Sequence, residues 1–265
     1  MIRNDAPYYN YEWGNLEPGL TDIGSDDAVL LYTQYSTQWD SLAHRGSLFD
    51  VSGTGKPEPV YYNGYRAGED VTMDAQQRVG ANALGIEHMA AHGVQGRGVL
   101  VDLFSHFGKF PRKLVAYDDL MRVMEEDNVQ VESGDILCLW TGLDQMIMHM
   151  QGRPDASIRE ACAVLDGSDQ RLLQWITDSG VAAIAADNLA VEALGQPQSG
   201  GHTGTTLPLH ELCLFRLGVH LGELWSLWEL AAWLRQHHRC RFLLTAPPLR
   251  LTGAVGSPLT PIATV

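Results

Sequence analysis

The segment from Thr33 to Gly46, TQYSTQWDSLAHRG, carries a row of polar side chains. Residues two apart in a strand share a face, so Gln34, Gln38 and Asp40 would point the same way, and His44 follows one short turn later. Converging oxygen and nitrogen atoms are what a divalent cation requires. A solvent-facing strand surface has a similar row of polar residues, and the spacing alone favours that alternative.

Two residues far downstream also have the chemistry of metal ligands. His210 lies in the first turn of a helix expected at 207–218, and Glu223 follows a short strand expected at 219–221. Imidazole nitrogens and carboxylate oxygens are common ligands of divalent metals. Taken alone, a histidine at a helix start and a glutamate on the surface are the simpler interpretation.

The run LPLHELCLFRLGVHLGELWSLWELA, residues 207–231, resembles the cyclase family of metal-dependent hydrolases, which includes bacterial kynurenine formamidase and isatin hydrolase. The family's signature of a histidine, a leucine-rich helix, Gly-Val and a glutamate falls on His210, Gly218, Val219 and Glu223. The segments FLLTAPPLRLTGAVGSPLTPIA, RGVLVDL, ESGDILCLWTG and VAAIAADNLAVE are also similar to the family. The resemblance covers nearly the whole chain from about Trp13.

The family's metal motif, His-x-Gly-Thr-His-x-Asp-x-Pro-x-His, falls on residues 34–44. The chain matches this motif at Thr37, Asp40 and His44 and departs from it at Gln34, Ser36, Gln38 and Leu42. The two glutamines stand where the family has metal-binding histidines. The polar row therefore resembles the family's metal-site strand, with its nitrogen ligands replaced by amides.

The resemblance implies that Asp40 is a metal ligand, that His210 and Glu223 complete a second metal position, and that His44 transfers protons. The two glutamines could ligate only through amide oxygens, which suit Mn²⁺, Mg²⁺ or Ca²⁺ better than Zn²⁺. Three states stay open. One ion could bind Asp40, His210 and Glu223, with His44 or a glutamine assisting; a hard ion could use the glutamine oxygens; or the site could be free of metal.

The function implied by the resemblance is hydrolysis of an amide or cyclic amide by a metal-activated water, with manganese, zinc or magnesium as the ion. The substrate would be a small molecule, aromatic or cyclic. Tyr61, Tyr62 and Tyr65 could line its pocket or serve as core or loop anchors, and Asn63 and Arg66 could bind an anionic or carbonyl group. A lactone or ester hydrolase using the same site is the close alternative. A non-catalytic binding protein that lost the metal is the competing class. Relatives are commonly oligomeric, so we expect a homo-oligomer.

Charge and composition narrow the classes of partner. The 265-residue chain has a formal net charge of −14, which argues against nucleic acid and anionic membranes as partners. Its start lacks a signal-peptide pattern, and no apolar run approaches the ~20 residues of a membrane-spanning helix. The four cysteines are scattered without a CxxC pair, as expected of reduced thiols. We therefore expect a cytoplasmic protein.

Strand and helix patterns alternate along the chain and predict one α/β domain. Strands are expected at 28–40, 97–104, 134–142, 181–187, 241–249 and 261–265. Helices are expected at 74–93, 117–129, 169–180, 207–218 and 226–238, the last beginning with a capping box of Ser226 and Glu229. Asp187 and Glu192 follow the strand at 181–187, and carboxyl ends of strands are where α/β sites gather, so we single out Asp187 as a possible neighbour of the site.

The expected domain spans residues 28–265, with a mixed β-sheet core and flanking helices. The family resemblance implies a swivelling β/β/α fold. Residues 1–27 are polar and rich in turn residues, which predicts an irregular N-terminal arm. Family members often carry extra residues before the WGNL segment, so a shortened N-terminus is a further expectation.

Overall fold

The computed structural model describes residues 11–15, 17–25, 27, 29–73, 79–194 and 204–265. The chain forms two compact units, Met1–Tyr32 and Thr33–Val265. In the first unit, strands β1 (Tyr11–Glu12) and β2 (Ile23–Gly24) pair antiparallel, with the 3-10 helix η1 (Trp13–Asn15) between them in sequence. The sequence motifs discussed above as site candidates lie in the second unit.

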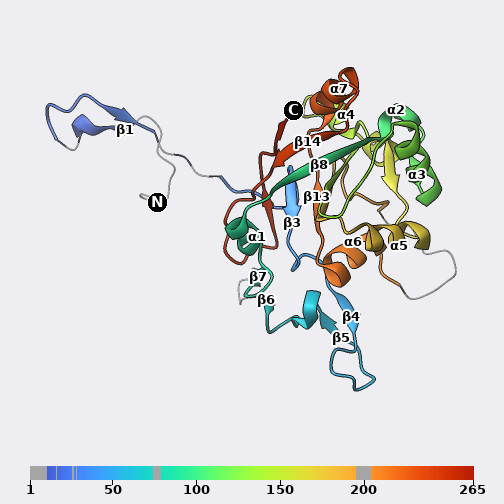
Figure 1. Cartoon of the computed structure of the whole chain (residues 1–265). Coiled ribbons are helices and arrows are strands. Elements are labelled where there is room, and N and C mark those ends of the chain that lie inside the picture. The colour runs from blue at the N-terminus through green and yellow to red at the C-terminus, as the bar shows by residue number, and fades with distance from the viewer. Residues whose placement is uncertain (1–10, 16, 26, 28, 74–78, 195–203) are drawn as a thin grey trace. The chain divides into compact units, whose positions relative to one another are not determined.

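A mixed eight-stranded sheet forms the centre of the second unit (Figure 1). Its strand order is β15-β3-β13-β12-β10-β8-β14-β16. The strands are β3 (Gln38–Asp40), β8 (Gln95–Asp102), β10 (Ile136–Trp140), β12 (Ala183–Ala186), β13 (His220–Glu223), β14 (Arg241–Thr245), β15 (Gly256–Pro258) and β16 (Ile262–Thr264). Strands β8, β10, β12 and β13 pair in parallel, and every other pairing in the sheet is antiparallel. The predicted mixed sheet is confirmed.

Helices cover both faces of this sheet, as predicted. One face packs against α3 (Tyr117–Glu126), α5 (Gln170–Ser179), α6 (Pro208–His210) and the π-helix η4 (Glu211–Leu217) that continues α6. The other face packs against α1 (Ile86–His92) and α7 (Trp228–Gln236). The central strands are buried on both faces, which explains their continuous apolar runs.

Shorter elements complete the second unit. They are β4 (Ser47–Phe49), β5 (Glu58–Val60), η2 (Tyr62–Gly64), β6 (Val71–Met73), β7 (Val79–Ala81), α2 (Leu103–Phe107), β9 (Lys113–Val115), α4 (Leu143–His149), η3 (Ala156–Glu160) and β11 (Ala163–Leu165). The four cysteines are free. Across the described ranges, the helices are too short and too polar to cross a lipid bilayer.

The predicted strand at 28–40 is much shorter than expected. Only Gln38–Asp40 forms a strand, and Thr33 to Thr37 form turns and bends; residue 28 lies outside the described residues. Strand β3 pairs with β13 on one side and β15 on the other, and those pairings involve only its three residues. The alternation of polar and apolar residues before Gln38 does not extend the strand, because no neighbouring strand among the described residues pairs with that segment. The side chain of Tyr35, in this unpaired segment, is 82% exposed.

The predicted helix at 74–93 is also shorter. Residues 74–78 lie outside the described residues, Val79–Ala81 forms β7, and only Ile86–His92 is helical. Gly80 and Gly85 interrupt the pattern, and glycine is a poor helix former. The helix ends at Gly93, whose φ of +74° gives the C-cap that the sequence predicted.

The predicted capping box at Ser226 and Glu229 is wrong. Helix α7 starts at Trp228 after the N-cap residue Leu227, which makes no side-chain cap. The side chain of Asp144, 83 positions earlier than Leu227, accepts the backbone N–H groups of Leu227 at 2.7 Å and Trp228 at 2.8 Å. A cap supplied from another helix leaves no local signal in the sequence.

We predict that Asp144→Ala lowers the free energy of unfolding by about 2–4 kcal/mol, because it leaves N–H groups at a helix start without an acceptor. Ser226→Ala, at the exposed position of the expected cap, should change it by less than about 0.5 kcal/mol. Urea unfolding monitored by tryptophan fluorescence measures both variants. Similar losses for the two would contradict the assignment of the cap to Asp144.

Candidate metal centre

The register of β3 and β13 brings Gln38, Asp40 and Glu223 to one face of the sheet. Gln38 lies directly opposite Glu223, and Asp40 is two residues from Gln38 in the same strand. Trp39, between them, packs on the other face, where its indole N–H donates to the carbonyl of Ala246 at 2.8 Å. The short strand therefore has the alternation that the sequence indicated for these three residues.

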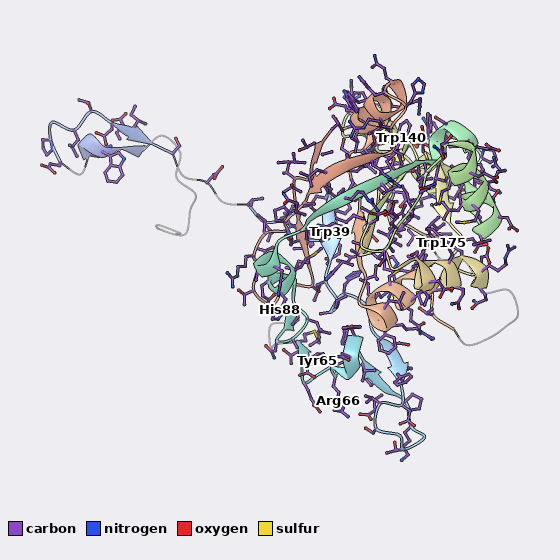
Figure 2. The ribbon with its side chains drawn as sticks, in the orientation of Figure 1. Trp39, Tyr65, Arg66, His88, Trp140 and Trp175 are labelled. Carbon is purple, nitrogen blue, oxygen red and sulfur yellow. The ribbon has the colours of Figure 1, made fainter. Side chains whose placement is uncertain are left out.

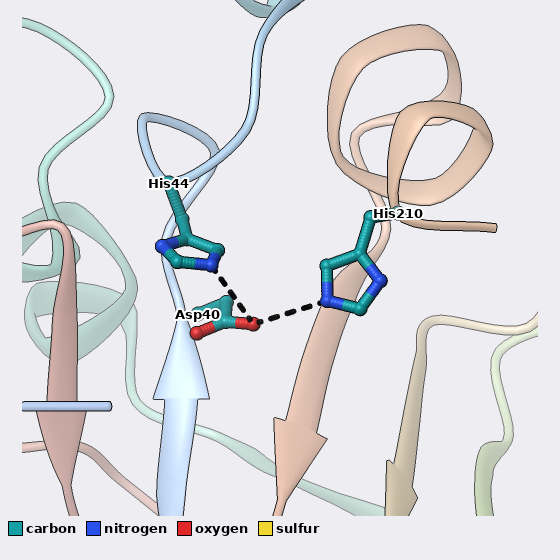
Figure 3. A group of neighbouring side chains, drawn as sticks. All are labelled: Asp40, His44 and His210. Atoms are coloured by element: carbon teal, nitrogen blue, oxygen red, sulfur yellow. Dashed lines mark ion pairs between the residues drawn. The ribbon is translucent and has the colours of Figure 1, made fainter. Parts of the chain in front are cut away.

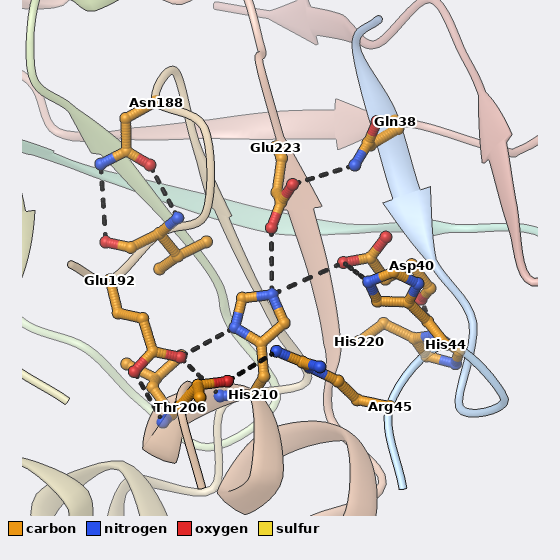
Figure 4. Close-up of polar contacts among 12 residues, drawn as sticks. Gln38, Asp40, His44, Arg45, Asn188, Glu192, Thr206, His210, His220 and Glu223 are labelled. Atoms are coloured by element: carbon orange, nitrogen blue, oxygen red, sulfur yellow. Dashed lines mark hydrogen bonds and ion pairs between the residues drawn. The ribbon is translucent and has the colours of Figure 1, made fainter. Parts of the chain in front are cut away.

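Helix α6 brings His210 against the same face of the sheet. The ring is 2% exposed, and its Nε2 lies 3.1 Å from Glu223 Oε1 and 3.9 Å from Asp40 Oδ2 (Figure 4). The helix continues as the π-helix η4, a form that is frequent at functional sites. It ends at Gly218 (φ +70°), where a Cβ would lie 2.7 Å from the Tyr62 ring, so only glycine fits.

Asp40, His44 and His210 together form a candidate metal site (Figure 3). One ligand atom from each lies within 4.8 Å of the others. Asp40 Oδ2 is 4.0 Å from His44 Nε2 and 3.9 Å from His210 Nε2. These separations are too long for hydrogen bonds. Because a metal lies about 2.0–2.2 Å from each nitrogen or oxygen ligand, a shared ion can bridge them with small adjustments.

Three of the buried side-chain atoms that lack a hydrogen-bond partner are oxygens, and these support the fit of a cation. Among the described residues, the atoms without a partner are Gln34 Nε2, Gln38 Oε1 and both carboxylate oxygens of Asp40. Buried polar groups are normally bonded, so each exception needs an explanation. All four atoms belong to the segment that carries the metal motif. The fully buried Asp40 carboxylate is thus suited to hold a positive ion.

The two glutamines occupy different surroundings. Gln38 Nε2 donates to Glu223 Oε2 at 2.9 Å, and this bond fixes the amide orientation, because a turned amide would face oxygen to carboxylate. Gln34 Oε1 accepts from the Thr33 hydroxyl at 2.9 Å, and its Nε2 lies against Gly256 in β15. Gln38 therefore joins the cluster through Glu223, whereas Gln34 packs on the neighbouring strand.

Glu192 is part of the cluster, although the sequence analysis gave it no role. Its Oε1 accepts from both the ring Nδ1 and the backbone N–H of His210 at 2.8 Å, and its Oε2 accepts from the backbone N–H of Leu209 at 3.0 Å. A carboxylate on one ring nitrogen fixes the tautomer and directs the other nitrogen toward a metal. The sequence feature that could have indicated a site role for Glu192 was its position shortly after the strand at 181–187.

Asp187 was singled out for the same reason, its position at the end of the strand at 181–187, but it has a different role. Its carboxylate accepts from the backbone N–H groups of Thr141, Gly142 and Asp144, and from the Thr141 hydroxyl. Burial and the charge of Asp144 raise the pKa of Asp187 to about 7. These hydrogen bonds fix the turn before α4, and none of them reaches Asp40, His44 or His210.

Burial and charge act differently on the three candidate ligands. Burial raises the pKa of Asp40 well above its ordinary value, and the charge of Glu223 raises it further. Burial and the positive charge of His210 lower the pKa of His44 to about 4. Burial also disfavours charge on His210, but its bonds to Glu192 and Glu223 outweigh this and raise its pKa to about 9. Near neutral pH the ring of His44 is therefore uncharged.

The aromatic residues after the motif have mixed surroundings. Tyr62 packs over Gly218, and Tyr65 is 39% exposed. Arg66 pairs with Glu58 at 3.1 Å, so its charge is already compensated. Figure 2 shows Tyr65 and Arg66 beside the β4–β5 region and Trp39 within the sheet. The side-chain hydrogen bonds and ion pair of Arg66 go to Glu58 and Ser52, and its backbone N–H donates to Asp70, away from the metal candidates.

We predict that Glu192→Ala lowers the free energy of unfolding by about 2–4 kcal/mol, because it leaves buried N–H groups of α6 without an acceptor. Glu211→Ala is the matched control, since Glu211 is in the same helical segment and pairs with the exposed Arg216. Its loss should stay within about 1 kcal/mol. Thermal and urea unfolding compare the two, and a larger loss for Glu211→Ala would argue against the role given to Glu192.

Comparison with known proteins gives consistent matches. Residues 1–193 match the family model Cyclase. A crystal structure described as a novel cyclase is 31% identical, covering 95% of this chain and 76% of its own, with a TM-score of 0.72. An isatin hydrolase bound to the product analogue thioisatinate is 14% identical, covering 98% and 80%, with a TM-score of 0.56.

A further solved structure is isatin hydrolase A from Labrenzia aggregata bound to benzyl benzoate. It is 13% identical, covering 99% of this chain and 86% of its own, with a TM-score of 0.58. At these identities, the two isatin hydrolases show a shared fold. The comparison with curated proteins found no match.

Proposed function

We propose that this chain, which belongs to the cyclase family, is a metal-dependent hydrolase of amide or cyclic amide bonds. The family membership rests on the match of residues 1–193 to the family model. The observation that carries the proposal is the Asp40 carboxylate. It is fully buried, its oxygens have no hydrogen-bond partner, and Oδ2 lies about equally far from two imidazole nitrogens, at 4.0 and 3.9 Å.

The charge of the cluster supports a divalent cation. Asp40, Glu192 and Glu223 are 0, 1 and 6% exposed, and they surround the single imidazole of His210. Ionised carboxylates are costly to bury unless their charge is compensated. A bound dication would balance the excess negative charge.

We assign Asp40, His210 and Glu223 as ligands of one manganese or zinc ion, or of magnesium, with the amide oxygen of Gln38 as a further donor. Gln34 was also predicted as a ligand, but its oxygen accepts from the Thr33 hydroxyl and its amide nitrogen packs against β15. The assigned residues are the ligand types of an open catalytic site that keeps a position for water. The ion, when bound, supplies a water of lowered pKa and polarises the scissile carbonyl. Glu192 holds the Nδ1 side of His210 and so orients Nε2 toward the ion.

His44 is the residue that we propose to carry the proton. Its side chain is 27% exposed while its Nε2 faces Asp40, so a substrate and solvent can reach the ring. In hydrolysis, the ring takes a proton from the attacking water and returns it to the leaving nitrogen as the C–N bond breaks. In a lactone or ester, the same proton would go to the leaving oxygen, so both substrate classes suit this arrangement.

The substrate we propose is a small aromatic or cyclic molecule, in line with the isatin hydrolases that share the fold. The competing proposal is a binding protein without metal. It is favoured by one observation: Gln38 and His210 both donate to Glu223, so part of the cluster already has protein partners. A homo-oligomeric state and a cytoplasmic location stay predictions.

Metal binding separates these two proposals. We predict that the purified chain binds about one equivalent of Mn²⁺ or Zn²⁺ and that an ion at 100 times its dissociation constant stabilises the fold by about 2.7 kcal/mol. Asp40→Asn should weaken binding by at least about 100-fold, since it removes a charged ligand. Isothermal titration and thermal shift measure both effects.

Asp178→Asn is the control for metal binding, because Asp178 is exposed on α5 and the substitution is the same. It should leave the affinity unchanged. No binding of either ion by the unaltered chain would exclude the metal-dependent mechanism and favour the binding protein.

The role of His44 can be separated from that of a ligand. We predict that His44→Ala lowers the turnover of formanilides, cyclic imides, isatin or lactones by about 10²–10⁴-fold, the usual contribution of a proton-transferring group. Metal affinity should stay near that of the unaltered chain. A parallel fall in metal affinity would instead make His44 a further ligand beside Asp40, His210 and Glu223.

A further inference from the structure

Two residues in left-handed backbone conformation flank the carboxylates that bind His210. Val191 has φ of +61° and directly precedes Glu192, and Leu224 has φ of +56° and directly follows Glu223. Positive φ is uncommon for any residue but glycine and is a genuine outlier for a β-branched valine. Such conformations persist only where the surrounding structure holds them, and they gather at functional sites.

One buried residue, Asn188, contacts both of these segments: its side chain bonds to Val191 (Figure 4), and its backbone carbonyl bonds to Leu224. Its Oδ1 accepts the backbone N–H of Val191 at 2.7 Å, and its Nδ2 lies 3.5 Å from the Val191 carbonyl. Nδ2 also donates to the carbonyl of Ala163 at 3.2 Å, which ties the turn to β11. The backbone carbonyl of Asn188 accepts the N–H of Leu224 at 3.0 Å.

We propose that Asn188 is a positioning residue for the metal centre, which holds Glu192 and Glu223 in the orientations that bind both ring nitrogens of His210. Glu192 Oε1 lies 2.8 Å from Nδ1, and Glu223 Oε1 lies 3.1 Å from Nε2. With both nitrogens engaged, the ring cannot turn. The orientation of Nε2 toward Asp40 therefore depends on the backbone beside each carboxylate.

The effect of Asn188 passes through the backbone at Val191. Without the bond to Oδ1, Val191 loses the interaction that holds its N–H in the left-handed conformation, and relaxation to negative φ would redirect the next residue. That residue is Glu192, whose carboxylate would leave Nδ1. Loss of the Asn188–Ala163 bond would also free the Asn188 carbonyl, which holds Leu224 next to Glu223.

The first test observes His210 directly and needs no metal. In the unaltered chain, the Nδ1–H bonded to Glu192 should give a slowly exchanging proton resonance, assigned by its absence in His210→Gln. Asn188→Ala should abolish or broaden it. Leu172→Ala is the control, because it creates a cavity at a fully buried α5 position in the same core while leaving these bonds in place. An unchanged resonance in Asn188→Ala would overturn the inference.

The second test measures metal affinity and rests on the proposed function. Removing a partner that orients a metal ligand typically weakens binding about 10–100-fold, and we expect that loss of Mn²⁺ affinity in Asn188→Ala but not in Leu172→Ala. Affinity equal to that of the unaltered chain would overturn the inference while the proposed function stands. If the unaltered chain binds no Mn²⁺ or Zn²⁺, the proposed function fails, and the resonance still decides the role of Asn188.

Asn188→Asp keeps both tests decisive if Asn188→Ala does not fold. It preserves the shape and the acceptor for Val191 but removes the Nδ2 donor to Ala163. We expect a smaller loss of metal affinity than in Asn188→Ala and a weakened Nδ1–H resonance. Unaltered values for both in a folded Asn188→Asp would contradict a positioning role.

Discussion

The burial of three carboxylates around one imidazole is the constraint on which the site depends. Glu192 and Glu223 are both hydrogen-bonded to His210, whereas the oxygens of Asp40 have no hydrogen-bond partner. Removing ionised groups from water is costly unless their charge is compensated. If all three carboxylates are ionised, the cluster holds more negative charge than His210 can neutralise, and a bound divalent cation would restore the balance.

Four segments that are distant in sequence must meet to build this cluster. The antiparallel pairing of β3 and β13 brings Gln38 opposite Glu223, helix α6 supplies His210, and the turn after β12 supplies Glu192. The turn after β12 and the end of β13 contain non-glycine residues with positive φ. Two of the eight non-glycine residues with positive φ among the described residues therefore lie next to the carboxylates that contact His210, and the regular central strands carry the stability of the core.

Much of the fold follows from the sequence, because the apolar strands at 134–142 and 181–187 and the helix at 169–180 lie close to β10, β12 and α5. The site was less predictable. The residue types and the family motif predicted Asp40, His44, His210 and Glu223 as site residues, and the structure places them close together. Glu192 was given no role, because its orientation depends on the positive φ of Val191, which a valine in the sequence does not indicate. Strand β3 is short because the neighbouring strands β13 and β15 pair with only three residues of the expected segment. The alternation of polar and apolar residues in the sequence does not show how far such pairing extends.

The central claim is that a divalent ion binds at Asp40 and His210, and anomalous diffraction tests it most directly. Crystals grown with Zn²⁺ would be measured on both sides of the zinc absorption edge. We expect one dominant peak at about 2.0–2.2 Å from an Asp40 oxygen and from His210 Nε2. A peak elsewhere, or none at saturating metal, would contradict the account and leave the carboxylates balanced by protons rather than by a metal.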